Sequence, residues 1–240
     1  MNNLNFEPNP KINIEVKYLK RAKRLTIRVL GSRTVRVTAP VRTKISEIQN
    51  MLNVHSDWIL KKHKMIEDRP VQNKIKFITG EVLPFYGEQL ILKIIDGKGL
   101  VTRFENELIV PVPPKITAFD NNAIAEKYIQ KLLIKWYQAE ALEKIKSRVH
   151  FFTERLNVSV KTISLKNYKS RWGACSSKGD LIFNWQIVTF EKHLFDYVLA
   201  HEVCHLKEMN HSQKFYGWLQ VLGFRKSEVY KQMKNVRNLF

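Results

Sequence analysis

The chain has 240 residues, of which 44% are hydrophobic and 26% are charged, and this composition is ordinary for a soluble globular protein. Its 41 Lys and Arg residues against 22 Asp and Glu give a formal net charge of +19. A surplus of this size favours polyanionic partners such as nucleic acid, nucleotides or an anionic membrane surface. The start of the chain lacks the positively charged segment followed by an apolar segment that is typical of a signal peptide. No apolar run approaches the ~18 residues of a membrane span. We therefore expect a cytoplasmic protein that does not cross a membrane.

The basic residues are concentrated near the start of the chain. Residues 11–44 hold eleven Lys or Arg against a single acid, Glu15. In the stretch YLKRAKRLTIRV the basic residues interleave with apolar ones, which indicates a strand with one buried face and one cationic face. Short strands are predicted at residues 12–19, 24–30 and 34–40.

The following residues continue the β-rich pattern after one helix. The helix is predicted at about 43–66, where apolar residues recur near helical spacing. A second β stretch covers about 74–113, in which apolar runs alternate with the turn signals YGE, DGKG and ENE. The double proline at 113–114 predicts a boundary. Residues 1–114 are therefore expected to form a β-rich, basic N-terminal region with one helix.

The remaining residues, 115–240, are expected to form a second domain that is dominated by helices. A long amphipathic helix is predicted at 119–150, with a buried face that contains Ile124, Tyr128, Leu132, Trp136, Ala139 and Leu142. Strands are predicted at 158–164 and 180–188, with a loop at 166–179 between them. Helices are predicted at about 191–209, 211–222 and 226–237. A β-rich front followed by a helix-rich back predicts an α+β fold.

Three of the seven histidines fall in the stretch AHEVCHLKEMNHSQKF at residues 200–215. HEVCH is a His-Glu-x-x-His motif, and its flanks contain neither Gly nor Pro, so we expect it on a helix. His201 and His205 would then stand on one face, about 6 Å apart at Cβ, and could reach a common ion. Glu202 would lie about a quarter-turn away, where its carboxylate could contact a metal-bound water as a general base.

A catalytic zinc site usually takes three protein ligands and leaves the fourth position to water. The third candidate is His211, which a continuous helix would turn about 120° away from the pair. We therefore expect the helix to end near Asn210, a residue type that tolerates a left-handed cap. Three neutral imidazoles would hold one Zn²⁺ ion and lower the pKa of its water. The alternatives are a solvated, histidine-rich helix end and a structural zinc site, which would need four closed ligands.

At this point the sequence resembles the YgjP-like zinc metallopeptidase domains, which are related to the WLM and SprT-like proteases. The resemblance rests on SRWGACSSKGDLIFNWQIV and DYVLAHEVCHLKEMNHSQKFYGWL. It implies a zincin-like domain at 115–240, in which the metal-binding helix packs on a small sheet and an edge strand lies above the cleft. It also implies zinc ligation by His201, His205 and His211, with Glu202 as the base.

Three further residues are candidate contacts for a substrate or an oxyanion. Tyr168 and Arg171 lie in the loop before the strand at 180–188, and in a zincin such a strand can pair with an extended substrate. Arg171 or Tyr168 could stabilise an oxyanion from this rim. Tyr216 is a candidate proton donor. The alternative for the loop is structural, with Arg171 and Trp172 forming a stack that closes it.

Three functional hypotheses follow from these residues. The first is a zinc-dependent metallopeptidase that acts on a peptide or protein substrate. The second is a metal-dependent hydrolase of a nucleotide or other phosphate ester, which the net charge favours, although three histidines suit zinc better than Mg²⁺. The third is a nucleic-acid-associated protease that docks DNA through residues 11–44. The sequence carries no indication of an oligomeric state.

Overall fold

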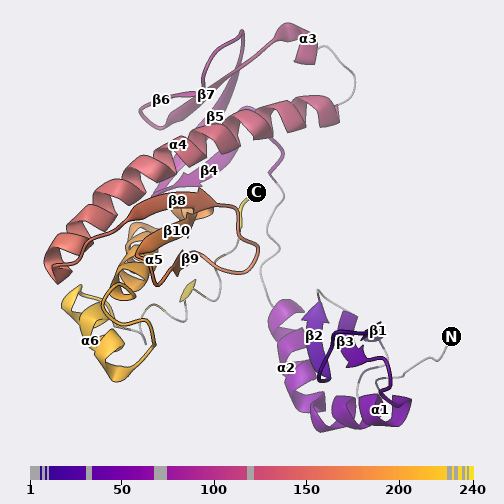
Figure 1. The fold of residues 1–240 in the computed structure, drawn as a ribbon. Coiled ribbons are helices and arrows are strands. Elements are labelled where there is room, and N and C mark those ends of the chain that lie inside the picture. The colour runs from indigo at the N-terminus through magenta and orange to yellow at the C-terminus, as the bar shows by residue number, and fades with distance from the viewer. Residues whose placement is uncertain are drawn as a thin grey trace. The chain divides into compact units, whose positions relative to one another are not determined.

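The computed structural model describes residues 6, 9, 11–30, 34–67, 75–117, 122–225, 229, 232–233, 236 and 238–240. Its contacts separate two compact units, Met1–Asn73 and Lys74–Phe240. Strands and helices occur in both units, and this mixture confirms the predicted α+β class (Figure 1). None of the helices in the described ranges combines the length and the hydropathy that crossing a bilayer requires.

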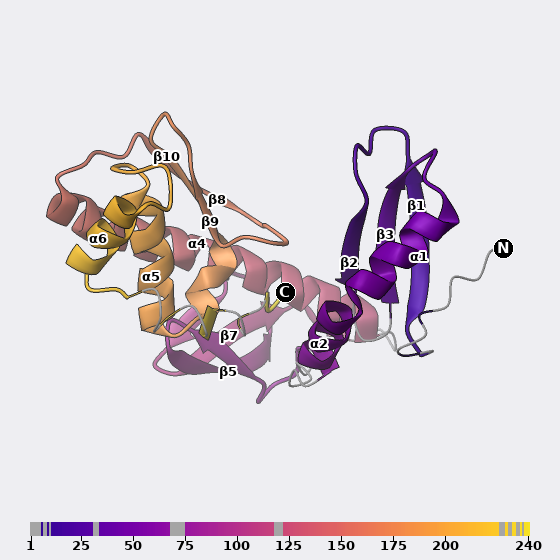
Figure 2. The ribbon, with the colours of Figure 1, turned by 90° about the horizontal axis from the view of Figure 1, so that it is seen from below.

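The N-terminal unit consists of a three-stranded sheet and two helices (Figure 2). Strands β1 (Asn13–Leu19), β2 (Thr26–Leu30) and β3 (Thr34–Pro40) lie in the order β1-β3-β2, close to their predicted positions. Strand β3 alternates buried and half-buried residues, and its buried face packs on the helices through Val35, Val37, Ala39, Ile48, Leu52 and Ile59.

The single helix predicted at 43–66 is in fact two helices, α1 (Ile45–Val54) and α2 (Ser56–Glu67). The division falls at His55, which has φ −102° and ψ 15° and so leaves the helical conformation. The break lets both helices place a buried residue on the sheet, Ile48 from α1 and Ile59 from α2.

The larger unit begins with a four-stranded sheet in the order β4-β5-β7-β6. Its strands are β4 (Val82–Phe85), β5 (Glu88–Asp96), β6 (Thr102–Phe104) and β7 (Glu107–Val112). Tyr86 and Gly87 form the two-residue turn between β4 and β5, with φ of 51° and 81°. Positive φ at both positions is typical of a tight hairpin turn, where Gly is favoured.

The short helix α3 (Pro114–Thr117) and the long helix α4 (Asn122–Leu156) follow this sheet. Helix α4 was expected at 119–150, and its most buried stripe differs from the predicted one: Tyr128, Leu132 and Trp136 are only partly buried against the core, and the residue after each is buried. The fully buried positions are Ile129, Leu133, Tyr137, Ala141, Ile145, Val149, Phe152 and Leu156, whereas Ile124 is 43% exposed. Adjacent apolar pairs such as Leu132-Leu133 give two parallel stripes of similar hydropathy, so spacing alone does not choose between them.

The first sheet shares its hydrophobic core with α4. The hydroxyl of Tyr137 on α4 donates a hydrogen bond of 2.9 Å to the carbonyl oxygen of Pro84 on β4, and the ring of Phe85 lies 4.9 Å from that of Trp136. Because this sheet packs on α4, both belong to the second compact unit, and the boundary between the two units lies after Asn73. It does not coincide with the division after residue 114 expected from the sequence.

A second, three-stranded sheet has the order β8-β10-β9. It contains β8 (Thr162–Lys166), β9 (Gly173–Cys175) and β10 (Asp180–Asn184), with β10 parallel to β8 and antiparallel to β9. The strand predicted at 180–188 ends at Asn184, whose side-chain oxygen accepts a hydrogen bond from the Gln186 amide and starts a 3₁₀ helix, η1 (Trp185–Thr189). The hydrogen bond from the Asn184 side chain satisfies the Gln186 amide in place of a strand partner, so the strand ends there.

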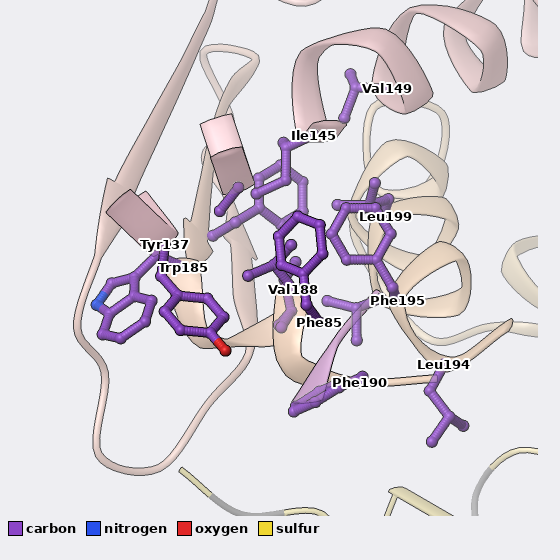
Figure 3. Packing of buried hydrophobic residues seen from close by; sticks show 14 of the residues in the cluster. Phe85, Tyr137, Ile145, Val149, Trp185, Val188, Phe190, Leu194, Phe195 and Leu199 are labelled. Atoms are coloured by element: carbon purple, nitrogen blue, oxygen red, sulfur yellow. The ribbon is translucent and has the colours of Figure 1, made fainter. Parts of the chain in front are cut away.

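Helices α5 (Lys192–Cys204) and α6 (Gln213–Val221) complete the described elements of this unit. The helix predicted at 226–237 lies largely outside the described residues. Figure 3 shows side chains from β4, α4, η1 and α5 meeting in one cluster, among them Phe85, Val188 and Phe195. The Arg148 guanidinium also donates to both carboxylate oxygens of Asp196 at 2.9 and 2.8 Å, which ties α4 to α5.

Candidate metal centre

The His-Glu-x-x-His motif lies at the end of α5, which packs on the edge strand β9 of the second sheet. Helix α5 has buried residues over most of its length, including Leu199, Ala200 and Val203 next to the motif. His201 and Glu202 belong to its last turn, and His205 is its C-cap residue. Burial on several sides fixes the helix in place, so the motif residues project from a rigid support.

The chain turns back after His205, as expected, but it does not do so by the expected route. The helix ends at Cys204, and the amides of Leu206 and Lys207 donate to the carbonyls of Val203 and Cys204 at 3.0 Å. Asn210 is not among the residues with positive φ, so the predicted left-handed cap at this position is wrong. A run of tight hydrogen-bonded turns replaces that cap.

His211 thereby comes back to the other two imidazoles. The ligand nitrogens of His201, His205 and His211 all lie within 4.8 Å of one another. The Nε2 atoms of His201 and His211 are 3.0 Å apart, and the three ring centroids are separated by 4.8 to 5.0 Å. Among the described residues, this is the one group of three or more His, Cys, Asp or Glu side chains able to surround a single ion.

The buried ring of Phe215 on α6 forms the floor under these three imidazoles. Its centroid lies 4.9 Å from that of His201, 4.6 Å from that of His205 and 4.8 Å from that of His211. Phe215 is held by the N-terminus of α6, where the Ser212 hydroxyl accepts a hydrogen bond of 3.3 Å from its amide. One aromatic ring thus restricts the rotation of all three imidazoles.

The environment keeps two of the imidazoles neutral, which is the form that binds metals. Burial, together with the two neighbouring imidazoles, lowers the pKa of His201 to about 3. Burial also lowers the pKa of His205. The Nδ1 of His205 lies 3.1 Å from the carbonyl oxygen of Glu208, which can only accept, so Nδ1 carries the proton and Nε2 keeps a free lone pair.

These donors fit a zinc ion. Two nitrogens bound to one tetrahedral zinc at about 2.0–2.1 Å lie about 3.3 Å apart. The Nε2 atoms of His201 and His211 are 3.0 Å apart, and the three ligand nitrogens lie within 4.8 Å of one another, so rotation of the side chains would bring the set onto one ion. Either of these two Nε2 atoms can donate to the other, depending on the tautomers of the two rings. Three imidazoles without thiolates or a ring of carboxylates are the donor set of catalytic zinc sites.

Glu202 lies between the two motif histidines in sequence and is only 7% exposed. Burial raises the pKa of Glu202 to about 7, whereas the positive charge of Arg171 acts in the opposite direction. A carboxylate with a pKa near neutrality can take up a proton and release it again at neutral pH, which suits a general base.

A comparison with known protein families matches residues 23–234 to the YgjP-like, metallopeptidase domain. The chain belongs to the YgjP-like family. Membership of a metallopeptidase domain family implies a bound metal, for which the described residues offer one suitable cluster, the three histidines.

Two solved structures also show likeness to this YgjP-like chain. One is the metallopeptidase zymogen of Pyrococcus abyssi abylysin, with 18% identity over 40% of this chain and 99% of that chain, at a TM-score of 0.36. The other is the zymogen of Methanocaldococcus jannaschii jannalysin, with 31% identity over 38% of this chain and 91% of that chain, at a TM-score of 0.33. No curated protein matches the chain.

The rim of the YgjP-like site contains the predicted Arg171 and Tyr168. The Arg171 guanidinium lies 4.9 Å from the centroid of the Tyr168 ring, and its charge acts on Glu202. Trp172 does not take part in this stack, because its ring packs edge-on against Phe190 at 4.7 Å. The charge of Arg171 therefore reaches Glu202 electrostatically, whereas Trp172 packs against Phe190.

The third predicted contact, Tyr216, lies beside the histidines. Its ring is stacked on His211 with the centroids 6.4 Å apart. Sequence analysis missed Tyr197, whose ring centroid is 6.0 Å from that of His201 and whose pKa is raised by burial and then by Tyr216. Tyr197 precedes His201 by four residues on the same helix face, and this spacing is the signal that could have identified it.

The strand that could receive a substrate is β9, and not the strand at 180–188 as predicted. Strand β10 lies in the middle of its sheet and is paired on both sides, whereas β9 is an edge strand. A cavity of about 650 Å³ lies at the turn between β9 and β10 and reaches the cluster at His205; it is lined by Asn157, Val158, Ser159, Ser176, Ser177, Gly179, His205, Leu206, Lys207 and Met209. Strand β9 was missed because three residues are too few to show an alternating pattern.

Proposed function

We propose that this YgjP-like chain is a zinc-dependent peptidase whose ion is held by His201, His205 and His211. The observation that carries the proposal is the convergence of three imidazole nitrogens within 4.8 Å, next to the buried carboxylate of Glu202. The family match supports the peptidase class.

Each residue has a defined part in the proposed reaction. The bound zinc would polarise the scissile carbonyl and acidify a water molecule. Glu202 accepts the proton of that water and later delivers it to the leaving amine, which its pKa of about 7 permits. Arg171 donates to the oxygen that gains negative charge, and the free edge of β9 holds the extended substrate by main-chain hydrogen bonds.

A phosphate ester is a less suitable substrate for this site than a peptide. Enzymes that hydrolyse phosphate esters with Mg²⁺ surround the metal with carboxylate oxygens. Within the described ranges, the one multi-residue cluster able to hold an ion contains three histidines and no carboxylate ligand. The donors therefore favour zinc and carbonyl chemistry over Mg²⁺ and phosphoryl chemistry.

The variant Glu202→Gln tests the proposal, because it keeps the size of the side chain and removes the base. We expect full zinc content and a loss of about 10²- to 10⁴-fold in kcat on fluorescein-labelled casein or a peptide library. The matched control is Glu208→Gln, since only the backbone carbonyl of Glu208 contacts His205. Full turnover in Glu202→Gln, or phosphate release from nucleoside triphosphates without peptide cleavage, would contradict the assignment.

The N-terminal unit supports a second, separate proposal. The turn after β1 and the segment after β3 lie at the same end of the sheet, because Leu19 pairs with Pro40 and Thr26 pairs with Thr38. Exposed cations from both segments gather at this end, namely Lys20, Arg21, Lys23, Arg24, Arg42 and Lys44. We propose that this basic end binds a polyanion such as DNA. Its support is charge alone, since the family match speaks for a peptide substrate.

Salt dependence tests this second role. Binding of a short DNA duplex should weaken steeply between 50 and 200 mM salt, by about 10- to 1000-fold for a handful of phosphate contacts. Replacing the four cations of the β1–β2 turn by Gln should reduce that slope and leave peptidase activity unchanged. Undetectable binding at low salt would remove the proposal and leave the peptidase assignment untouched.

A further inference from the structure

Gly173, the first residue of the edge strand β9, lies directly against the side chain of Glu202. A Cβ atom at Gly173 would lie 2.5 Å from the Cγ of Glu202, 2.6 Å from its Oε1 and 2.8 Å from its Cδ. Carbon atoms in favourable contact are about 3.5–4.0 Å apart. No side chain larger than hydrogen therefore fits at position 173 while Glu202 keeps its place.

The glycine is needed here for space and not for backbone freedom. Gly173 is not among the glycines with positive φ, and it pairs with Phe183 in the antiparallel ladder, where any residue can adopt the backbone conformation. Glycine weakens a strand and is found where another group approaches the backbone closely. At Gly173 the approaching group is the carboxyl end of Glu202.

We propose that Gly173 is a positioning residue: because it has no side chain, the carboxylate of Glu202 can pack directly against the backbone of β9 and is held there. The proposal rests on the proposed role of Glu202 as the general base. It assigns a part in the reaction to a residue that has no functional side chain of its own.

Strand β9 is held firmly enough that an added methyl group would move Glu202 and not the strand. Ala174 and Cys175 pair with β10, and the Trp172 carbonyl accepts a hydrogen bond of 2.8 Å from the Asn184 amide. The atoms that the methyl group meets, Cγ, Cδ and Oε1 of Glu202, belong to a side chain and not to a backbone, and all three move when that side chain rotates about χ1. Gly173→Ala should therefore displace the carboxylate at a small cost in stability.

The direct test is the crystal structure of Gly173→Ala with zinc bound. We expect the Glu202 carboxylate to move by about 1 Å or more, with the three imidazoles and β9 in their original places and zinc content unchanged. The control is Gly217→Ala on α6, where an added Cβ has nothing within 4 Å. An unmoved Glu202 with a displaced β9 would overturn the proposal, and this readout does not depend on any activity.

Kinetics on labelled casein provide the second readout. We expect Gly173→Ala to lower kcat by about 10- to 100-fold with little change in KM, since a misplacement of about 1 Å can cost about 10²-fold. In the Glu202→Ala background the same substitution should have no further effect on residual activity, because it acts through Glu202. Additive losses in the two backgrounds would overturn the positioning role.

Stability measurements cover the case in which Gly173→Ala folds poorly. Glu202→Ala removes all three atoms that the new methyl group would meet, so the double variant should have the Tm of Glu202→Ala. A double variant that unfolds as readily as Gly173→Ala would show that β9 itself needs the glycine, against the proposal. If Glu202 moves in the crystal of Gly173→Ala but the wild-type protein never cleaves casein or peptides, the proposed peptidase function fails. The claim that Gly173 positions the Glu202 side chain would still hold.

Discussion

The helical side and the strand side of the candidate site are built in different ways. On the helical side, His201, His205 and His211 rest on Phe215 and are separated by at most ten residues in sequence. On the strand side, Gly173 and Arg171 come from a three-residue strand and an exposed loop about thirty residues away. The helical side brings three imidazoles together by packing, and the strand side lies against the carboxylate of Glu202 and supplies the charge that acts on it.

Substitution of His211 should give the largest effect and would break the helical side. His211→Ala leaves two imidazoles, and catalytic zinc sites normally have three protein ligands. We expect the zinc content of protein purified without a histidine tag to fall well below one per chain, and peptidase activity to fall at least ~10³-fold. His150→Ala, an exposed histidine on α4, is the control. Unchanged zinc content in His211→Ala would mean that the three rings do not share an ion.

Substitution of Arg171 should have an intermediate effect that is confined to the strand side. Arg171→Ala removes the cation whose charge acts on Glu202 without touching the histidines, so zinc content should stay unchanged while kcat/KM falls by about 10- to 100-fold. Lys169→Ala, another exposed cation of the same loop, should leave kcat/KM within about twofold. Loss of zinc in Arg171→Ala would show that the two sides are not separable.

The smallest effect is expected at Ser212, which supports the helical side from below. Ser212→Ala removes the cap that accepts a hydrogen bond from the Phe215 amide, at a cost of about 1 kcal/mol. The Tm should fall by about 2–4 °C for a chain of this size. The exposed Gln220 on the same helix offers a control, since Gln220→Ala should change stability by less than about 0.5 kcal/mol. An equal fall in the Tm of both variants would show that Ser212 does not stabilise α6 as a cap.

The same contrast explains which parts of the site could be predicted from the sequence. Histidines at i and i+4 share a helix face for any helical backbone, so the pairing of His201 and His205 follows from local geometry. The return of His211 could be expected because a third ligand was needed, but its route could not. The expected left-handed Asn210 is absent, and consecutive turns that begin at Cys204 take its place.

The strand side was harder to predict because it depends on long-range contacts. The approach of Gly173 to Glu202 joins residues that are 29 positions apart, and no spacing rule connects them. The inward face of α4 shows the same limit, since Leu132 and Leu133 have the same hydropathy and only tertiary packing buries the second one completely. The α+β class and the strands of the N-terminal unit depend on local periodicity, and these were predicted correctly.

The most direct measurement of the central claim is zinc X-ray absorption spectroscopy on protein purified without a histidine tag. Our account predicts one zinc per chain, surrounded by three imidazole nitrogens at about 2.0–2.1 Å and one oxygen ligand. A protein that takes up no stoichiometric zinc, or a spectrum with fewer than three imidazoles around the ion, would contradict it.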